Sequence, residues 1–211
     1  MTGSPSSAAS PAPGLRERRR RETRRELAAA ALELFEQKGL HHTTTDEIAE
    51  AAGISSRTFF RYAETKEHAL FADDDGFDIL VARVRDALAR GVDVISAIEQ
   101  AHLDLLDDFD REPADRQSRV LRVRRLVIAE PSLLALALAS DAEHARVLLE
   151  LVLTANAAIS EFEARTVLTA MGTTLRLSFD EWVISAERGE RVSVRSMYER
   201  VLTRLRTYFA G

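Results

Sequence analysis

The sequence predicts an all-α fold in two parts, a short N-terminal domain and a longer helical C-terminal domain. Apolar residues recur at intervals of three and four, which is the periodicity of a helix with one buried face. No stretch of alternating β-branched residues predicts a strand. The 211 residues are 45% hydrophobic and 30% charged, with nine glycines and five prolines, so the helices have an ample core and few breaks. We place a disordered tail rich in Ser, Ala, Pro and Gly at residues 1–14, and the two domains at 15–72 and 73–211.

The net charge of −5 is divided unevenly along the chain. Residues 1–72 contain 11 Lys/Arg and 10 Asp/Glu, whereas residues 73–211 contain 18 and 24. Seven arginines lie between Leu15 and Arg25. A local patch of this kind, and not the total charge, decides contact with nucleic acid.

The composition also excludes several kinds of site. The chain has no cysteine, so it has no disulfide and no thiolate metal site. No apolar run has membrane-spanning length, and the N-terminus lacks the apolar core of a signal peptide. We therefore expect a cytoplasmic protein that does not enter a membrane.

The first predicted helix follows a basic arm. The arm, Arg16 to Arg25, runs into a helix over about Thr23 to Lys38, which Gly39 ends. Such an arm is typical either of a solvated helix start or of a segment that contacts DNA phosphates. His41 and His42 follow it and are expected on a loop surface, because adjacent histidines project to different faces and make a poor metal pair.

Two short helices around one glycine are predicted between Thr45 and Tyr62. Thr45 is the expected N-cap of the first helix, and Gly53 lies where a helix end needs a residue that tolerates positive φ. Ser55 is the expected N-cap of the second helix, in which Phe59 is assigned to the core. A helix, a tight turn and a second helix with polar residues at its start predict a helix-turn-helix that binds DNA.

The residues around this turn are the predicted DNA contacts. A helix N-terminus with free N–H groups attracts phosphate, and the first turn of the second helix enters the major groove. Arg57 is the expected guanine contact, because its guanidinium matches O6 and N7. The sequence does not decide whether Phe60 contacts a thymine methyl group or packs in the core. Arg61, Tyr62 and Lys66 are expected to contact phosphates. The full set is Thr44, Thr45, Ser55, Ser56, Arg57, Thr58, Phe60, Arg61, Tyr62 and Lys66.

The segment from Arg24 to Phe71 resembles the N-terminal domain of the TetR family of bacterial transcriptional regulators. The resemblance lies in Phe35-Glu36-Gln37-Lys38-Gly39, Thr43 to Ala49, Ala52-Gly53-Ile54-Ser55, Arg57 to Tyr62 and Thr65-Lys66-Glu67. It implies a three-helix DNA-binding domain, a helical ligand-binding and dimerisation domain, threonines that touch the DNA backbone, and repression of a palindromic operator by a homodimer. The chain departs from the family pattern at Ala63, where an aromatic residue is usual, and at Glu64.

The C-terminal domain is predicted to consist of amphipathic helices separated by Gly and Pro. The expected spans are Phe77 to Ala89, Val92 to Asp110, Arg116 to Ala129 after Pro113, Pro131 to Thr154, Ser160 to Arg188 and Ser193 to Phe209.

Two polar residues inside apolar stripes are candidates for a ligand site. Arg124 lies within the face formed by Val120, Val123, Val127 and Ile128, and His102 lies among Ile98, Leu105 and Phe109. A buried charge must be paired or neutralised, so an internal salt bridge for Arg124 and a hydrogen-bonded core imidazole for His102 are the simpler interpretations. The alternative is that Arg124 meets the polar or anionic head of a small-molecule effector. The predicted ligand-binding residues are His102, Arg124, Phe109 and Val127.

A second resemblance concerns the effector. The run from Arg122 to Leu133 looks like the sensor domain of actinobacterial TetR-type regulators related to the mycofactocin regulator. That group is associated with acyl-CoA-like ligands, so the resemblance implies an amphipathic effector such as an acyl thioester.

Two apolar stripes in the last two helices suggest a homodimer contact. A four-helix contact between two copies would bury them, although such stripes are more often plain core. Dimerisation also suits the recognition helix, since two copies related by two-fold symmetry read a palindrome. The stripes are Leu168, Met171, Leu175, Phe179 and Trp182, and Val194, Met197, Val201, Leu205 and Tyr208.

Two alternatives to a ligand-released repressor stay open. The first alternative is a constitutive DNA-binding dimer without an effector. The second is a helical ligand carrier or enzyme. The sequence predicts no catalytic residue, cofactor or metal site: it has no histidine pair at i,i+4 and no nucleotide-binding glycine motif. Asp73, Asp74 and Asp75 lack the ligand spacing of a calcium loop and are interpreted as a solvated connector.

Overall fold

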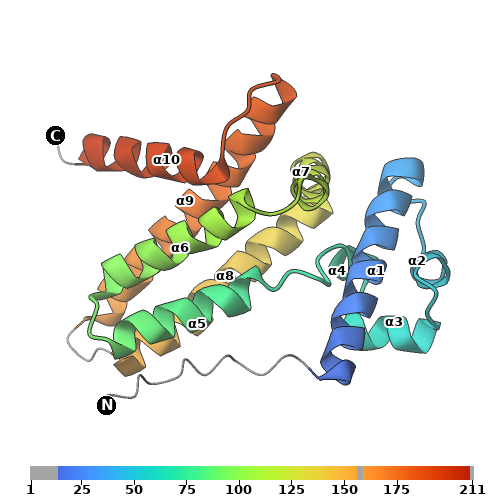
Figure 1. Ribbon diagram of the computed structural model, residues 1–211, viewed down its shortest axis with the longest axis horizontal. Coiled ribbons are helices and arrows are strands. Elements are labelled where there is room, and N and C mark those ends of the chain that lie inside the picture. The colour runs from blue at the N-terminus through green and yellow to red at the C-terminus, as the bar shows by residue number, and fades with distance from the viewer. Residues whose placement is uncertain (1–13, 156–158, 210–211) are drawn as a thin grey trace, which may run out of the picture. The chain divides into compact units, whose positions relative to one another are not determined.

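The computed structural model describes residues 14–155 and 159–209, and side chains as far as residue 207. This part of the chain contains ten α-helices and no strand, so the all-α prediction is confirmed (Figure 1). The chain divides into two compact units, one ending at Asp73 and the other beginning at Asp74. The tail predicted at residues 1–14 lies outside the described residues except for Gly14.

The N-terminal unit is built on α1 (Leu15–Lys38), which packs against α2 (Thr45–Ala51) and α4 (Lys66–Leu70), while α3 (Ser56–Tyr62) packs against α2. The predicted start of α1 at Thr23 is wrong. The basic arm is helical from Leu15, because Arg and Glu are good helix formers and Glu17 pairs with Arg21 one turn later. The core of the unit includes Leu27, Ala28, Ala31, Leu32, Phe35, Ile48, Phe59 and Leu70.

The cap of α2 differs from the prediction by one residue. Thr44, and not Thr45, is the N-cap: its hydroxyl accepts from the Glu47 N–H, and the Glu47 carboxylate accepts from the Thr44 N–H at 2.9 Å. This reciprocal capping box needs Glu three residues after the cap, and that spacing selects Thr44. Gly53 has φ 66° and Ser55 caps α3 through the Thr58 N–H, as predicted.

The capping box predicts a change of stability with acid. The hydrogen bond from Lys38 is the largest effect on Glu47 and, with those from Thr44, lowers the pKa of Glu47 from 4.5 to about 2. A carboxyl whose pKa is depressed by folding stabilises the fold above its unfolded pKa, and this contribution disappears as the pH falls through the folded pKa. We expect the difference in free energy of unfolding between wild type and Glu47→Gln to be constant above pH 5 and to shrink between about pH 4.5 and 2.

Chemical denaturation across this pH range measures the difference, and Glu50→Gln on the same helix is the matched control. Glu50 is exposed, and its side chain makes no hydrogen bond or ion pair with any described residue, so its substitution should give a difference that does not vary with pH. A Glu47→Gln difference that persists unchanged to pH 2 would contradict the role of the carboxylate.

The C-terminal unit contains six described helices, and their ends lie within two residues of the predicted ones. The prolines, glycines and N-caps that separate them are local signals, which is why the sequence places these ends well. The helices are α5 (Gly76–Ala89), α6 (Val94–Asp110), α7 (Ala114–Ala129), α8 (Pro131–Ala155), α9 (Glu161–Glu187) and α10 (Val194–Phe209).

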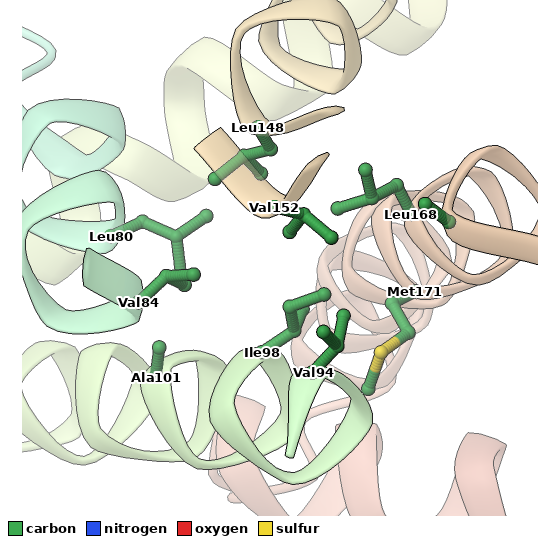
Figure 2. Packing of buried hydrophobic residues seen from close by; sticks show 10 residues of the cluster. Leu80, Val84, Val94, Ile98, Ala101, Leu148, Val152, Leu168 and Met171 are labelled. Carbon is green, nitrogen blue, oxygen red and sulfur yellow. The ribbon is translucent and has the colours of Figure 1, made fainter. Parts of the chain in front are cut away.

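Two apolar clusters hold this unit together. In the first, Leu80 and Val84 of α5 and Ile98 of α6 pack towards Leu148 of α8 and Leu168 of α9 (Figure 2). The second lies between α6, α9 and α10, and its buried members are Leu106, Trp182, Val183, Val194, Met197 and Tyr198.

These clusters correct the predicted dimer stripes. Leu168 and Met171 are buried in the first cluster and Trp182, Val194 and Met197 in the second, so these parts of both stripes are core of the single chain. Val201 and Leu205 are only half-buried, and the side chain of Tyr208 lies outside the described residues. The predicted buried face of α7 also loses one member. Ile128 is 49% exposed, although Val127 beside it in the last turn of α7 is buried.

A carboxylate at the end of α6 fixes the start of α10. The Val194 N–H donates to Oδ1 of Asp110 at 3.0 Å, and the Arg195 N–H donates to Oδ2 at 3.1 Å. The first N–H groups of a helix have no partner within it, and the positive end of the helix dipole favours an anion there. Arg195 adds an ion pair with Asp107, so one turn of α6 binds the first turn of α10 twice.

Candidate DNA-binding surface and ligand cavity

The outer face of α3 presents two large side chains to solvent. Phe59 is fully buried, as predicted, whereas Phe60 is 57% exposed and meets the edge of Phe59 with ring centroids 5.3 Å apart. Phe60 is therefore a surface residue and not part of the core. Arg57 is exposed and makes no hydrogen bond or ion pair with any described residue. A guanidinium and an aromatic ring on one short helix offer both polar and apolar contacts to base edges.

Several predicted contacts are engaged within the domain. Ser56 Oγ donates to Asp46 Oδ1 at 2.7 Å, which ties the start of α3 to α2. The Ser55 hydroxyl bonds Thr58, and the Thr44 hydroxyl bonds Glu47. The Ser56 hydroxyl therefore orients α3 on α2, whereas the Ser55 and Thr44 hydroxyls cap α3 and α2 respectively. Thr45 is half-buried at the start of α2.

The remaining three predicted contacts lie at and after the end of α3. The guanidinium of Arg61 lies 4.9 Å from the ring centroid of Tyr62 and donates to its hydroxyl at 3.4 Å. Lys66 donates from Nζ to the carbonyl oxygens of Leu40 and Thr43 at 2.7 and 3.0 Å. Two of the three ammonium protons of Lys66 therefore hold the loop between α1 and α2, a structural role that the sequence did not indicate.

The C-terminal unit contains a cavity of about 680 Å³ between α5, α6, α8 and α9, with Arg124 of α7 at its edge. Its apolar wall shares Leu80, Ile98, Leu148 and Leu168 with the first cluster. A concave, mainly apolar space with a few polar groups is the usual form of a small-molecule site.

Two of the four predicted ligand residues line this cavity. His102 is 2% exposed, and its Nδ1 lies 3.0 Å from the Tyr198 hydroxyl. Arg124 is half-buried and places its guanidinium carbon 4.7 Å from the ring centroid of Phe179. Burial lowers the pKa of both groups, that of His102 to about 4, while Asp180 and other carboxylates oppose the shift of Arg124.

The other two predicted ligand residues do not line it. Phe109 belongs to an aromatic group, 5.5 Å from Trp182 and 5.6 Å from Phe179 between ring centroids. Val127 is buried in the core. The reason is the same for both: an apolar stripe shows that a residue faces inward, but does not show whether it faces a cavity or packed side chains.

The cavity has polar lining residues that sequence reasoning missed. Asp141 pairs with Arg176 at 3.4 Å, and Arg176 lies 3.6 Å from Asp180. His144 stacks on Phe77 with ring centroids 3.7 Å apart. These residues come from α5, α8 and α9, so only the packing of the helices brings them together.

Gly172 also lines the cavity, from the middle of α9. A Cβ placed on Gly172 would have no side-chain or distant backbone atom within 4 Å. Its isolation within a helical pattern is a signal in the sequence, because Gly is unfavourable inside a helix.

Two kinds of site are not found in the described residues. No group of three or more His, Asp or Glu side chains there is placed to hold a metal ion. No helix in the described ranges is both long and apolar enough to cross a bilayer.

Comparisons with known proteins agree with this arrangement. Residues 27–72 match the family model of bacterial regulatory proteins of the TetR family. The chain is 37% identical over 139 residues to the HTH-type transcriptional regulator TcmR of Streptomyces glaucescens, a match that covers 64% of this chain and 61% of that protein. It is 26% identical over 178 residues to a Mycobacterium tuberculosis protein named as the mycofactocin biosynthesis transcriptional regulator MftR, over 84% of this chain and 86% of that one.

A solved structure resembles the chain over most of its length. Thermus thermophilus FadR, described as a TetR-family transcriptional repressor in complex with lauroyl-CoA, superposes with a TM-score of 0.50 at 25% identity, covering 85% of this chain and 91% of that one. These relatives are regulators and not enzymes. The N-terminal match, the helix-turn-helix and the helical second unit lead to one conclusion: residues 27–72 form the N-terminal domain of the TetR family of bacterial regulatory proteins, and the chain resembles TetR-family regulators over most of its length.

Proposed function

We propose that this regulator represses transcription as a homodimer, which binds a palindromic operator through α3 and leaves it when a small amphipathic ligand enters the cavity. Its N-terminal unit would be the DNA-binding domain and its C-terminal unit the ligand-binding and dimerisation domain. Such a protein acts in the cytoplasm, where the DNA lies. The observation that carries the proposal is the outer face of α3, where Arg57 and Phe60 are exposed on a helix fixed by internal hydrogen bonds.

In this proposal the ten predicted contacts act in two ways. Arg57 and Phe60 read base edges, and the neighbouring hydroxyls, Arg61, Tyr62 and Lys66 position the helix on the backbone. A recognition helix of seven residues touches few bases. Two copies are therefore needed for useful affinity, as the family's usual dimer provides.

The dimer contact is proposed on the outer faces of α9 and α10. Leu177 and Ile184 of α9 are 40% and 37% exposed and lie seven residues apart, on one side of the helix. Val201 and Leu205 of α10 are half-buried. Apolar side chains at this spacing suit a four-helix contact between two copies.

The effector is proposed to be amphipathic, because the cavity combines an apolar wall with polar groups. The lauroyl-CoA bound to FadR makes an acyl thioester the first class to test. The ligand needs only a higher affinity for the state that does not bind DNA. By reciprocity, operator DNA then weakens ligand binding by the same factor.

Selection of bound sequences from a random duplex pool tests the DNA-binding part, and release of the selected operator by lauroyl-CoA tests the ligand part. Physiological salt suppresses non-specific binding through the arginines of α1. An enriched inverted repeat supports the dimer. An operator complex that neither lauroyl-CoA nor a panel of amphipathic compounds dissociates would favour a constitutive DNA-binding dimer instead.

We expect Arg57→Ala to weaken binding to the selected operator by about 1–3 kcal/mol and to relax the preference for one base pair in each half-site, because a bidentate contact to guanine is lost. Binding isotherms on the operator and on single-base variants measure both effects. Arg85→Ala is the matched control, since Arg85 is an exposed arginine on α5, outside the helix-turn-helix. A uniform loss of affinity for every sequence would instead assign Arg57 to a phosphate.

A further inference from the structure

We infer that His102 is the specificity-determining donor of the cavity, and that its Nε2–H binds an uncharged acceptor oxygen, such as a carbonyl, on the ligand. The inference rests on the proposed function, which makes this cavity the effector site, and it adds the chemical group that His102 recognises on the effector.

The position of His102 leaves one ring nitrogen for the cavity. The residue is 2% exposed on α6 and lines the cavity. Its Nδ1 is engaged by Tyr198 of α10, which belongs to the second apolar cluster. Nε2 has no hydrogen-bond partner among the described residues. A donor that lines a mainly apolar cavity without a protein partner is satisfied when a ligand supplies an acceptor.

Tyr198 decides which nitrogen carries the proton. Tyr198 is fully buried, and within the described part of the chain its hydroxyl bonds only His102. If Nδ1 carried the proton, the hydroxyl would accept it and its own proton would have no acceptor in the core. If the hydroxyl donates to Nδ1, the hydroxyl and Nδ1 are both satisfied, and the proton of the imidazole lies on Nε2, which faces the cavity without a protein partner.

Both groups are uncharged at neutral pH. Burial lowers the pKa of His102 to about 4 and raises the pKa of Tyr198. The imidazole therefore offers the cavity a neutral N–H donor, which requires an acceptor on the ligand.

The charges around the cavity favour an uncharged acceptor over a carboxylate. The cations Arg124 and Arg176 already have Asp141 and Asp180 near them. A buried carboxylate needs a cation or several donors to offset its lost hydration, and one neutral N–H does not offset it. A ketone, ester or thioester oxygen carries a much smaller desolvation cost.

The tautomer is tested first, without a ligand. Long-range ¹H–¹⁵N spectra of the full chain labelled in histidine should place the His102 proton on Nε2 at pH 7 and keep the ring neutral to about pH 5, since its pKa is about 4. His102→Gln assigns the resonance. A proton on Nδ1 would overturn the inference.

The recognition is tested with 2-nonanone, nonane and nonanoate as probes in calorimetry. We expect the ketone to bind about tenfold more tightly than nonane, as one buried hydrogen bond predicts, and more tightly than nonanoate. In the double variant His102→Phe, Tyr198→Phe the advantage of the ketone over nonane should disappear while nonane still binds. That variant removes both polar partners together and replaces them with rings, which spares the fold from an unsatisfied group.

Equal binding of ketone and nonane, tighter binding of nonanoate, or no binding of any probe would overturn the inference. Operator binding of the same samples separates this outcome from failure of the proposed function. If the wild-type chain binds its operator but shows no preference for the ketone, only the inference about His102 fails. If the wild-type chain enriches no operator, the proposed function itself is contradicted.

Discussion

Phe59→Ala should destabilise the N-terminal unit by about 3–5 kcal/mol, the usual cost of removing a fully buried Phe side chain. Phe59 is 0% exposed in a unit of about 60 described residues, where no neighbouring core can compensate for the cavity left behind. This loss is comparable with the whole stability of a small domain, so we expect the unit to unfold and operator binding to disappear.

Denaturation followed by two signals locates the effect. Trp182 is the single tryptophan and lies in the C-terminal unit, so its fluorescence reports that unit, whereas circular dichroism reports both. Only the dichroism transition should shift. Phe60→Ala is the matched control at the next position: Phe60 is 57% exposed, so the fold should change little while operator affinity falls. Equal destabilisation by both substitutions would contradict the assignment of the two faces of α3.

Asp110→Ala should destabilise the C-terminal unit by about 3 kcal/mol, because two backbone N–H groups at the start of α10 lose a charged acceptor. Val194, one of the two donors, is fully buried, so water does not readily replace the carboxylate. Trp182 fluorescence during denaturation measures the loss, since Trp182 and Val194 share one cluster.

Two further variants test the reason given for this loss. Asp110→Asn retains one acceptor oxygen and should recover part of the stability. Asp104→Ala removes a carboxylate from the same helix that bonds only Gln100 among the described residues, so it should cost a few tenths of a kcal/mol. An Asp110→Ala effect no larger than that of Asp104→Ala would show that α10 is held by its apolar face alone.

The sequence predicts well those features that depend on residues close together in the chain. Gly53 and Ser55 determine the turn and the cap of α3 because each acts within three or four residues of its own position. Arg124 and His102 were found because a polar residue within an apolar stripe is visible along one helix.

The features that sequence missed depend on contacts between helices. The cavity combines residues of α5, α6, α8 and α9, and no pattern along one helix brings Phe77, Asp141 and Arg176 together. The place of Phe109 outside the cavity lining was not predicted, because only the arrangement of α9 brings Phe179 and Trp182 against its ring. Lys66 was assigned to phosphate alone because the carbonyl oxygens that it binds are contributed by a loop more than 20 residues earlier.

On the proposed function, Gly172 is a position at which a single codon would change the range of ligands that the cavity accepts. Neither the backbone of α9 nor a neighbouring side chain requires glycine there, since a Cβ would meet open space and alanine is the better helix former. Replacement by Ala, Val and Leu in turn would add one or two carbon atoms at a time to the wall of the cavity. A graded library at this position would therefore convert the chain into a set of biosensors that respond to ligands of decreasing size.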